Sequence, residues 1–288
     1  MGWRTVIIDS QCKITYKCGF IVIKKEIPVT VHVSEIDLMV LATPQICFSG
    51  VAIAELLKAK VKLIFCDERR DPLAEAVAYY DNYHTSKNVL QQINWQPETK
   101  NRVATAIIKQ KIVNQANLLN KYNLEEGKML IEYSNNVLYK DETNREGHAA
   151  KVYFNALFGL DFERRKNTII NAALNYGYSI LLSYINREIV ATGYITQIGI
   201  NHCNEYNQFN LSCDLIEPFR ILIDNIVYSD PPQELNQAYK TKLINVLSSY
   251  VRYDSETTLL SNAISKYVKN VLYVLTSNNT DNLLLYEF

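Results

Sequence analysis

Short apolar runs separated by turn-length gaps fill the first 85 residues of the chain. The runs at residues 3–9, 13–16, 20–24, 27–33 and 36–41 are rich in Val, Ile and Thr and have the length of β-strands. After Ser49-Gly50 the apolar residues recur at helical spacing, and residues 61–65 have the composition of a buried strand. A series of short strands with one helix predicts a small sandwich-like domain over residues 1–85.

The second part of the chain changes to helical spacing. Val103, Ile107 and Ile112 mark one apolar stripe, and Pro231-Pro232 mark a break between two later helices. A polar stretch at residues 86–98 separates the two patterns and is predicted to be a linker. The fold class expected is α+β, with the β-rich N-terminal domain followed by a larger all-α domain over residues 99–288. Further helices are expected over residues 148–157, 168–191, 215–227, 235–251 and 259–275.

Composition and charge exclude several classes of protein. Apolar residues make up 48% of the chain, which excludes wholesale disorder. Thirty basic residues balance thirty acidic ones, so binding to DNA through a strong net positive charge is excluded, although a local basic groove is not. The six cysteines form no Cys-x-x-Cys pair. The chain shows no signal-peptide pattern and no apolar stretch of the roughly 20 residues that span a bilayer, which predicts a cytoplasmic protein without a membrane partner.

Three carboxylates and one imidazole are the candidates for chemistry. Asp214 and Glu217 are three residues apart and share a face if they are helical, and His202 lies upstream of them in a predicted loop. With Glu146 these residues would suit a manganese or magnesium ion that keeps open positions for phosphate oxygens and water. The sequence alone leaves a structural alternative open. Asp214 and Glu217 also fit a capping box, and Glu146 fits a first-turn acid after an Asn144 cap.

A resemblance adds to this interpretation. The segment NREGHAAKVYF at residues 144–154 closely resembles the glutamate motif of the CRISPR-associated integrase, the spacer-acquisition endonuclease of the adaptation module. Further segments follow in that family's order, the motifs nearest the N-terminus resemble the type II branch, and the likeness extends over nearly the whole chain. These segments are NAALNYGY (171–178), QIGINH (197–202), DLIEPFR (214–220), GWRT (2–5) and VSEID (33–37).

The resemblance assigns roles to particular residues. It implies that Glu146, His202 and Glu217 are the catalytic, metal-binding triad and that Asp214 is a supporting acid. Beside a metal site for phosphate, the nearby basic residues become candidates for DNA contacts. These are Arg145, Lys151, Arg164, Arg165, Lys166, Arg187 and Arg220. Residues 278–288 match no feature of the family.

The resemblance also implies an activity and partners. The expected enzyme uses Mg²⁺ or Mn²⁺, and the 3′-hydroxyl of a captured DNA fragment attacks a phosphodiester at the border of a CRISPR repeat, with hydrolysis when water replaces the hydroxyl. The expected partners are double-stranded DNA and a second copy of the chain that dimerises through the β-rich domain. A small adaptation subunit is also expected, with two integrase dimers flanking a dimer of that subunit. The alternative is a non-catalytic DNA-binding scaffold in which the glutamates only cap helices.

Overall fold

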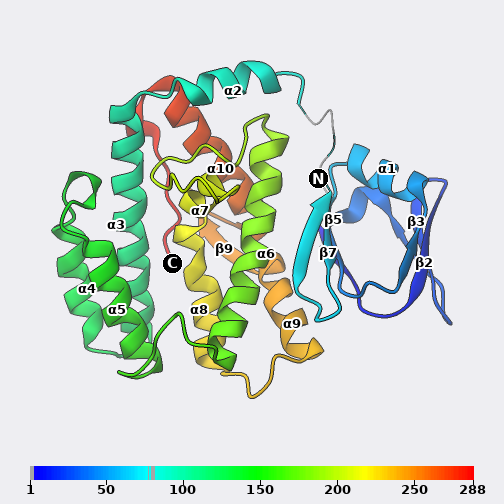
Figure 1. Ribbon diagram of the computed structural model, residues 1–288, viewed down its shortest axis with the longest axis horizontal. Helices are drawn as coiled ribbons and strands as arrows, with labels where there is room; N and C mark the ends of the chain where they lie inside the picture. Colours follow the sequence, from blue (N-terminus) through cyan, green and yellow to red (C-terminus); the bar gives the residue numbers. More distant parts are fainter. Residues whose placement is uncertain (1–2, 77, 79–81) are drawn as a thin grey trace. The chain divides into compact units, whose positions relative to one another are not determined.

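The computed structural model describes residues 3–76, 78 and 82–288, which leaves Gly2 of the GWRT motif outside the described residues (Figure 1). The chain divides into two compact units between residues 83 and 84, with residues 190–192 grouped with the first unit. The predicted linker at residues 86–98 is wrong, because helix α2 (Thr85–Ile93) occupies most of it and α3 begins at Pro97. This stretch is polar because most of α2 is exposed.

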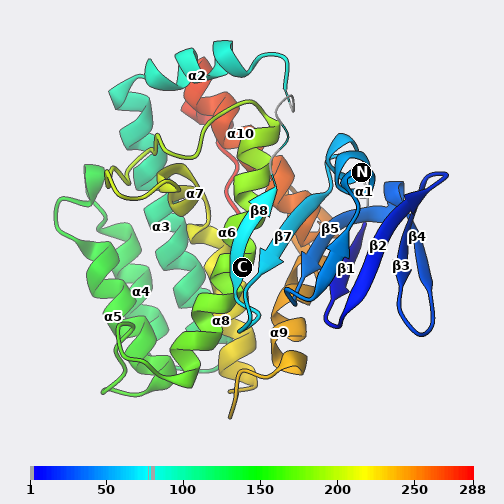
Figure 2. The ribbon, with the colours of Figure 1, turned by 45° about the vertical axis from the view of Figure 1, so that its right-hand side comes forward.

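Up to residue 76, the described residues of the first unit form two four-stranded sheets and one α-helix (Figure 2). One sheet has the order β1-β5-β7-β8, with parallel pairs except for antiparallel β7 and β8, and the other has the order β4-β3-β2-β6. The elements are β1 (Arg4–Ile8), β2 (Cys12–Lys17), β3 (Phe20–Lys24), β4 (Val29–His32), η1 (Val33–Glu35), β5 (Ile36–Leu41), β6 (Ile46–Phe48), α1 (Gly50–Lys58), β7 (Lys62–Cys66) and β8 (Pro72–Ala76).

Both sheets and α1 contribute to one hydrophobic core, which confirms the sandwich-like β-rich domain. Ile14 and Ile23 from one sheet pack in the same buried cluster as Met39 and Leu63 from the other. Every position of β5 is buried, as expected for a parallel strand covered on both faces. At the start of α1 the Ser49 side chain accepts a hydrogen bond from a backbone N–H in the first helical turn.

The second unit is mainly helical and is built around the 25-residue helix α3. Helices α4 and α5 pack against α3, and α8, α10 and the turn η3 contact it as well. The predicted helices at 148–157, 168–191 and 259–275 are confirmed with slightly longer or shifted bounds. The elements are α2 (Thr85–Ile93), α3 (Pro97–Lys121), α4 (Glu126–Asn135), η2 (Tyr139–Asp141), α5 (Arg145–Phe158), α6 (Ile169–Ala191), α7 (Asn210–Leu215), η3 (Glu217–Phe219), α8 (Arg220–Ser229), α9 (Gln237–Ile244), η4 (Asn245–Ser248), β9 (Tyr250–Tyr253), β10 (Glu256–Leu259), α10 (Leu260–Ser277) and η5 (Thr280–Asn282).

Two predicted helices of this unit are wrong in part. The helix over 235–251 ends at Ile244, and β9 and β10 form an antiparallel hairpin in a domain that was expected to be all-α. The hairpin turn has positive φ at Asp254 and Ser255, as in a type I′ turn, and exposure alternates along β9. The helix over 215–227 is broken by the one-turn η3, where Pro218 removes a backbone donor.

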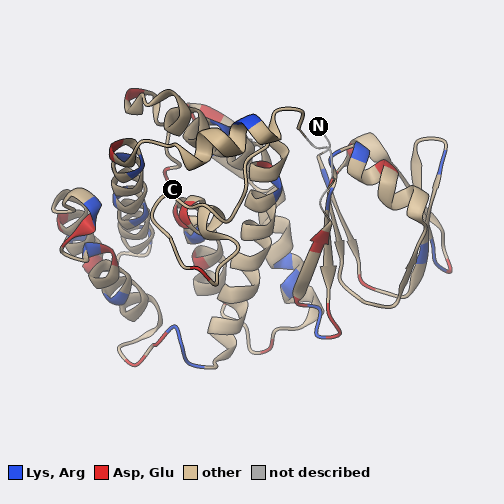
Figure 3. Cartoon of the chain, turned by 45° about the horizontal axis from the view of Figure 1, so that its top comes forward, with Lys and Arg blue, Asp and Glu red and all other residues tan. Residues whose placement is uncertain are grey.

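The described helices of both units are too short or too polar to cross a bilayer. Figure 3 shows basic and acidic residues interspersed on the helices of the second unit, consistent with the balanced charge of the chain. A basic surface on this chain would therefore have to come from a local group of residues rather than from its net charge.

Candidate active site

Glu146 lies in the first turn of α5, where Asp141 caps the helix. The two carboxylate oxygens of Asp141 accept hydrogen bonds from the backbone N–H groups of Arg145 (2.7 Å) and Glu146 (2.9 Å). The predicted Asn144 cap is wrong, because Asn144 has a left-handed backbone with φ of 52° and its side chain makes no cap hydrogen bond. The carboxylate of Glu146 is therefore not needed to complete this helix end.

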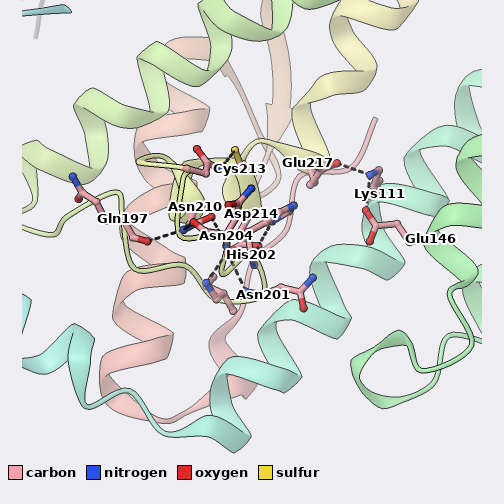
Figure 4. Close-up of polar contacts among 12 residues, drawn as sticks. Lys111, Glu146, Gln197, Asn201, His202, Asn204, Asn210, Cys213, Asp214 and Glu217 are labelled. Carbon is pink, nitrogen blue, oxygen red and sulfur yellow. Dashed lines mark hydrogen bonds and ion pairs between the residues drawn. The ribbon is translucent and has the colours of Figure 1, made fainter. Parts of the chain in front are cut away.

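Glu146 and Glu217 meet on a single ammonium group (Figure 4). Lys111 Nζ on α3 lies 2.6 Å from Glu146 Oε1 and 2.6 Å from Glu217 Oε2. The Lys111 side chain is 16% exposed, and those of Glu146 and Glu217 are 29% and 8% exposed. Burial of Lys111 favours its neutral form, but the two carboxylates outweigh burial and raise the pKa of Lys111. Two carboxylates from distant parts of the sequence are thus arranged around one positive charge.

Glu217 is held from a second side by Arg220. Glu217 begins the turn η3, and its Oε1 lies 3.1 Å from Arg220 Nη2, three residues later. Burial alone would raise the pKa of Glu217, but Arg220 and then Lys111 lower it below its ordinary value. Glu217 therefore stays ionised although it is buried.

Asp214 organises the loop that carries His202. Asp214 Oδ2 accepts the backbone N–H groups of Ile200 (2.6 Å) and Asn201 (3.1 Å), and Oδ1 accepts that of His202 (3.1 Å). The capping-box interpretation is wrong, because Asp214 lies inside α7 and its carboxylate bonds this loop instead of its own helix. Gly199 permits the close approach, since a Cβ there would lie 2.3 Å from the His202 carbonyl oxygen and 2.8 Å from Asp214 Oδ2.

The same carboxylate orients the imidazole of His202. His202 Nδ1 lies 2.6 Å from Asp214 Oδ1, and the His202 side chain is 43% exposed. This hydrogen bond is the main reason that the pKa of His202 is raised above its ordinary value, against the effect of burial. Because Nδ1 bonds Asp214, Nε2 is the ring nitrogen left for a further ligand.

Two amide side chains complete the support of this loop. Gln92 on α2 donates to the carbonyl oxygens of Ile195 and Ile198, each at 2.8 Å, and accepts from the backbone N–H of Ile195. Asn210 donates to the carbonyl oxygens of Gln197 and Asn204. Gln92 is fully buried, whereas its helix is mostly exposed. Gln92 lies in the predicted linker, and no pattern in the sequence indicates a role for it at the site.

The family of the chain can now be assigned. A sequence profile of the family described as CRISPR associated protein Cas1 matches residues 5–230, which is more than half of the chain. The chain belongs to the Cas1 family. A curated relative, the CRISPR-associated endonuclease Cas1 of Neisseria meningitidis serogroup C, is 30% identical over 295 residues, and the alignment covers 100% of this chain and 97% of the relative. The predicted family and the mixed α+β fold are thus confirmed.

Solved structures share the Cas1 fold. A casposase bound to integration product matches with a TM-score of 0.78 and 18% identity, covering 96% of this chain and 92% of the casposase chain. A Cas6-RT-Cas1–Cas2 complex matches with a TM-score of 0.73 and 17% identity, covering 99% of this chain and 36% of that longer chain. At these identities the likeness establishes the architecture alone.

The residues of this Cas1-family chain fit a hard divalent cation in part. The convergence of Glu146 and Glu217 on one ammonium shows that the fold accommodates positive charge between two oxygen ligands. His202 is oriented by Asp214 in the way that metal-binding histidines usually are. Within residues 3–76, 78 and 82–288, however, no group of three or more His, Cys, Asp or Glu side chains is gathered closely enough to hold a metal ion. Glu146 and Glu217 lie on the same ammonium group. His202 is linked to Glu217 indirectly, because it bonds Asp214 on α7 and α7 leads into the turn η3 that carries Glu217.

The seven basic candidates for DNA contact differ in how far they are engaged within the protein. Arg164 donates to Asn171 and Asn175, and Arg187 pairs with Glu188. The Arg145 and Arg220 guanidinium groups lie over the rings of Tyr133 and Tyr178. Lys151, Arg165 and Lys166 are exposed, and Lys166 pairs with Glu163. The exposed members are the best placed to meet phosphates from solvent.

A cavity of about 260 Å³ lies beside Glu217 in the helical unit. Lys111, Arg164 and Arg220 line it together with Glu217 and Asp224. Asp224 on α8 is fully buried and accepts hydrogen bonds from the hydroxyl groups of Tyr153 and Tyr178. Burial raises the pKa of Asp224 to about 6, although the tyrosine hydrogen bonds lower it.

Proposed function

We propose that this Cas1-family protein is a metal-dependent DNA integrase and endonuclease that inserts captured DNA fragments into a CRISPR array. The observation that carries the proposal is the meeting of Glu146 and Glu217 on one ammonium group beside the Asp214–His202 pair. Family membership and the curated relative named as an endonuclease support the same reaction class. In this proposal Glu146, His202 and Glu217 hold Mg²⁺ or Mn²⁺ and Asp214 supports His202.

The residues of the chain prepare the site for an anionic substrate. Glu146 and Glu217 supply hard oxygen ligands, and His202 supplies a nitrogen ligand through Nε2. A divalent cation bound there would neutralise charge that develops on the phosphoryl oxygens. A cation held by both carboxylates requires the Lys111 ammonium to leave its place between them. Lys111 would then be a further positive group at the site that could pair with a DNA phosphate.

The proposed reaction is a transesterification. The oxygen of the fragment's 3′-hydroxyl forms a bond to phosphorus, and the bond from that phosphorus to the 3′-oxygen of the repeat strand breaks. The attacking hydroxyl loses its proton and the leaving 3′-oxygen gains one. One phosphodiester is made for each one broken, so no nucleotide cofactor is consumed. When water attacks instead, the same site acts as an endonuclease.

The proposed partners follow the resemblance. We propose that double-stranded DNA is the substrate, both as captured fragment and as CRISPR repeat, and that the chain works as a homodimer in the cytoplasm. A chain of the solved Cas6-RT-Cas1–Cas2 complex shares this fold, which supports a Cas2 partner for this chain. We further propose that two dimers of this chain flank one dimer of that partner.

Strand transfer with purified protein and its small partner subunit tests the proposal. The wild type should join a fragment to repeat DNA with Mn²⁺ and stop when EDTA is added. Glu146→Gln should remove the activity. The matched control is Glu126→Gln, because Glu126 is also a first-turn glutamate but lies exposed on α4. If Glu146 only stabilised a helix end, both variants would lose little.

The scaffold alternative makes the opposite predictions. A non-catalytic DNA-binding scaffold should bind DNA equally with and without Mn²⁺, and the wild type should neither join nor cut branched DNA. The ion pairs of Glu146 and Glu217 weigh against it, because neither carboxylate serves as a helix cap. DNA binding without any metal-dependent strand transfer by the wild type would favour the scaffold.

A further inference from the structure

The C-terminal segment, residues 283–288, is extended and is held by asparagine side chains. Leu284 N–H donates to Asn270 Oδ1 (2.8 Å), and Asn114 Nδ2 donates to the Tyr286 carbonyl oxygen (3.0 Å). Phe288 N–H donates to Asn114 Oδ1 (3.1 Å). An extended backbone without a neighbouring strand needs such partners, because buried peptide groups are costly when unpaired. The segment is therefore fixed to α10 and α3 by specific hydrogen bonds.

Asn114 links this segment to the turn that carries Glu217. Its Nδ2 also donates to the Pro218 carbonyl oxygen (2.9 Å), so the two amide hydrogens bridge the turn and the segment. Asn114 is 1% exposed and lies one helical turn after Lys111 on α3. One face of α3 thus holds both the carboxylate of Glu217, through Lys111, and the backbone next to it, through Asn114.

Tyr286 supports the same turn from its other side. The Tyr286 ring stacks on that of Phe219, with centroids 4.9 Å apart and an interplanar angle of 20°. Tyr286 is 3% exposed and Phe219 is fully buried. Because η3 is a single three-residue turn, it has few hydrogen bonds of its own to set its position. Contacts from outside must therefore determine where Glu217 points.

We propose that the C-terminal segment is a positioning element of the site, which fixes Glu217 through Asn114 and through the Tyr286–Phe219 stack. Tyr286 and Asn114 act through the turn and do not touch the reacting atoms. The inference rests on the proposed function for its effect on catalysis. The placement of the turn can be measured without catalysis.

The test compares variants of the full chain. Tyr286→Ala removes the stack, Tyr286→Phe keeps the ring, and Tyr286→Leu keeps apolar volume in case the alanine variant fails to fold. The matched control is Tyr273→Ala, because Tyr273 is an exposed tyrosine on α10. Thermal unfolding first identifies which variants are folded.

Hydrogen exchange then measures how firmly the turn is held in place. The Phe219 N–H, which bonds the Ile216 carbonyl oxygen within the turn, should exchange at least about tenfold faster in Tyr286→Ala or Tyr286→Leu. Exchange in the loop at residues 196–204 should not change. Tyr286→Phe and Tyr273→Ala should match the wild type in both regions. Wild-type exchange at Phe219 in a folded Tyr286→Ala or Tyr286→Leu variant would overturn the inference.

Strand-transfer kinetics separate this inference from the proposed function. The rate at saturating DNA should fall about tenfold or more in Tyr286→Ala, with little change in the DNA concentration for half-maximal rate, and Tyr286→Phe should restore it. An inactive wild type would count against the proposed function, and the exchange result would still decide the inference. An active wild type with an equally active, folded Tyr286→Ala would overturn the inference alone.

Discussion

The turn that carries Glu217 and the loop that carries His202 are held in different ways. Glu217 lies in a buried turn packed by Phe219 and Tyr286 and is paired with two cations. His202 lies in a half-exposed loop whose backbone is hydrogen-bonded by Asp214, Gln92 and Asn210 rather than packed in a core. The first region depends on apolar packing and charge pairing, and the second on directional hydrogen bonds.

The difference predicts how each region responds to change. A packed turn loses its geometry when ring volume or a partner charge is removed, because the cost of an unpaired buried charge is large. A loop held by one carboxylate loses several hydrogen bonds at once when that carboxylate is changed, and its exposed imidazole responds to pH. Substitutions on the two sides should therefore produce distinguishable defects, in charge balance for Glu217 and in pH dependence for His202.

The largest effect is expected for Glu217→Gln. The amide keeps the shape of the side chain but removes the charge that Lys111 and Arg220 pair with, and it is a poor ligand for a divalent cation. Strand transfer should fall by more than about 100-fold, since even outer partners of metal ligands cost 10 to 100-fold. Initial rates across Mn²⁺ concentrations measure this. Glu205→Gln, an exposed glutamate in the His202 loop, is the control and should stay near wild type.

Lys111→Met tests whether the region around Glu146 and Glu217 depends on the Lys111 ammonium group. Without Lys111 the two glutamates repel each other, while Arg220 still pairs Glu217, so we expect a loss of about 2 kcal/mol in unfolding free energy without metal. Mn²⁺ should then raise the thermal midpoint more in Lys111→Met than in the wild type. Lys109→Met, an exposed lysine on the same helix, is the control. Wild-type stability of Lys111→Met in EDTA would contradict this account of the site.

The sequence identified the candidate residues, but it did not predict the contacts that those residues make. The resemblance identified Glu146, His202 and Glu217 as candidates. The Lys111 bridge was not predictable, because Lys111 looks like an ordinary solvated lysine on an amphipathic helix and its partners are far away in the sequence. Asp141 was missed as a helix cap because Asn144, at the expected position, has a left-handed backbone that only coordinates reveal.

In the fold, long regular elements were predicted from the sequence and short irregular ones were not. Long periodic segments such as α6 and α10 were predicted within a few residues, since their apolar spacing is regular. The hairpin β9–β10 was not predicted, and the helix expected over residues 235–251 ran into its first strand, because four-residue strands carry too little alternation to be recognised between two helices. The polar stretch that forms α2 was predicted as a linker because it has few apolar residues, and the role of Gln92 was missed for the same reason. A short, exposed helix needs few apolar residues, and α2 contacts the His202 loop through the hydrogen bonds of Gln92, which is polar.

Asp214→Asn tests whether the loop that carries His202 depends on the Asp214 carboxylate. His202 must be neutral to bind a cation, so its raised pKa makes wild-type activity fall already as the pH drops through a value above 6.5. The asparagine removes the charge that raises this pKa, so the acid limb of the pH–rate profile should move to lower pH. The maximal rate should also fall about 10 to 100-fold, because the loop loses its carboxylate acceptor.

Profiles from pH 5.5 to 9 and NMR titration of the His202 ring measure both effects of Asp214→Asn. Asp281→Asn, an exposed aspartate near the end of the chain, is the control. An acid limb that does not move, together with an unchanged His202 titration, would remove Asp214 from its proposed role.

The smallest effect concerns Asp224 on α8, which lines the same cavity as Glu217 of the turn η3. Its folded-state pKa is about 6, above the ordinary value of 3.8, because burial disfavours the charge. The folded state therefore holds a proton that the unfolded state has lost, and wild-type stability falls as the pH rises from about 4 through 6. Between pH 5 and pH 8 this linkage amounts to about 1.5 kcal/mol. Asp224→Asn cannot titrate, so its stability relative to the wild type should improve by about that amount between the two pH values, whatever its hydrogen bonds to Tyr153 and Tyr178 cost. Urea unfolding of both proteins at pH 5 and pH 8 measures the double difference, and Asp281→Asn should show none. An equal effect of Asp224→Asn at both pH values would mean that Asp224 is as well solvated as a loop carboxylate, and the contrast between a buried Glu217 region and an open His202 loop would then not extend to α8.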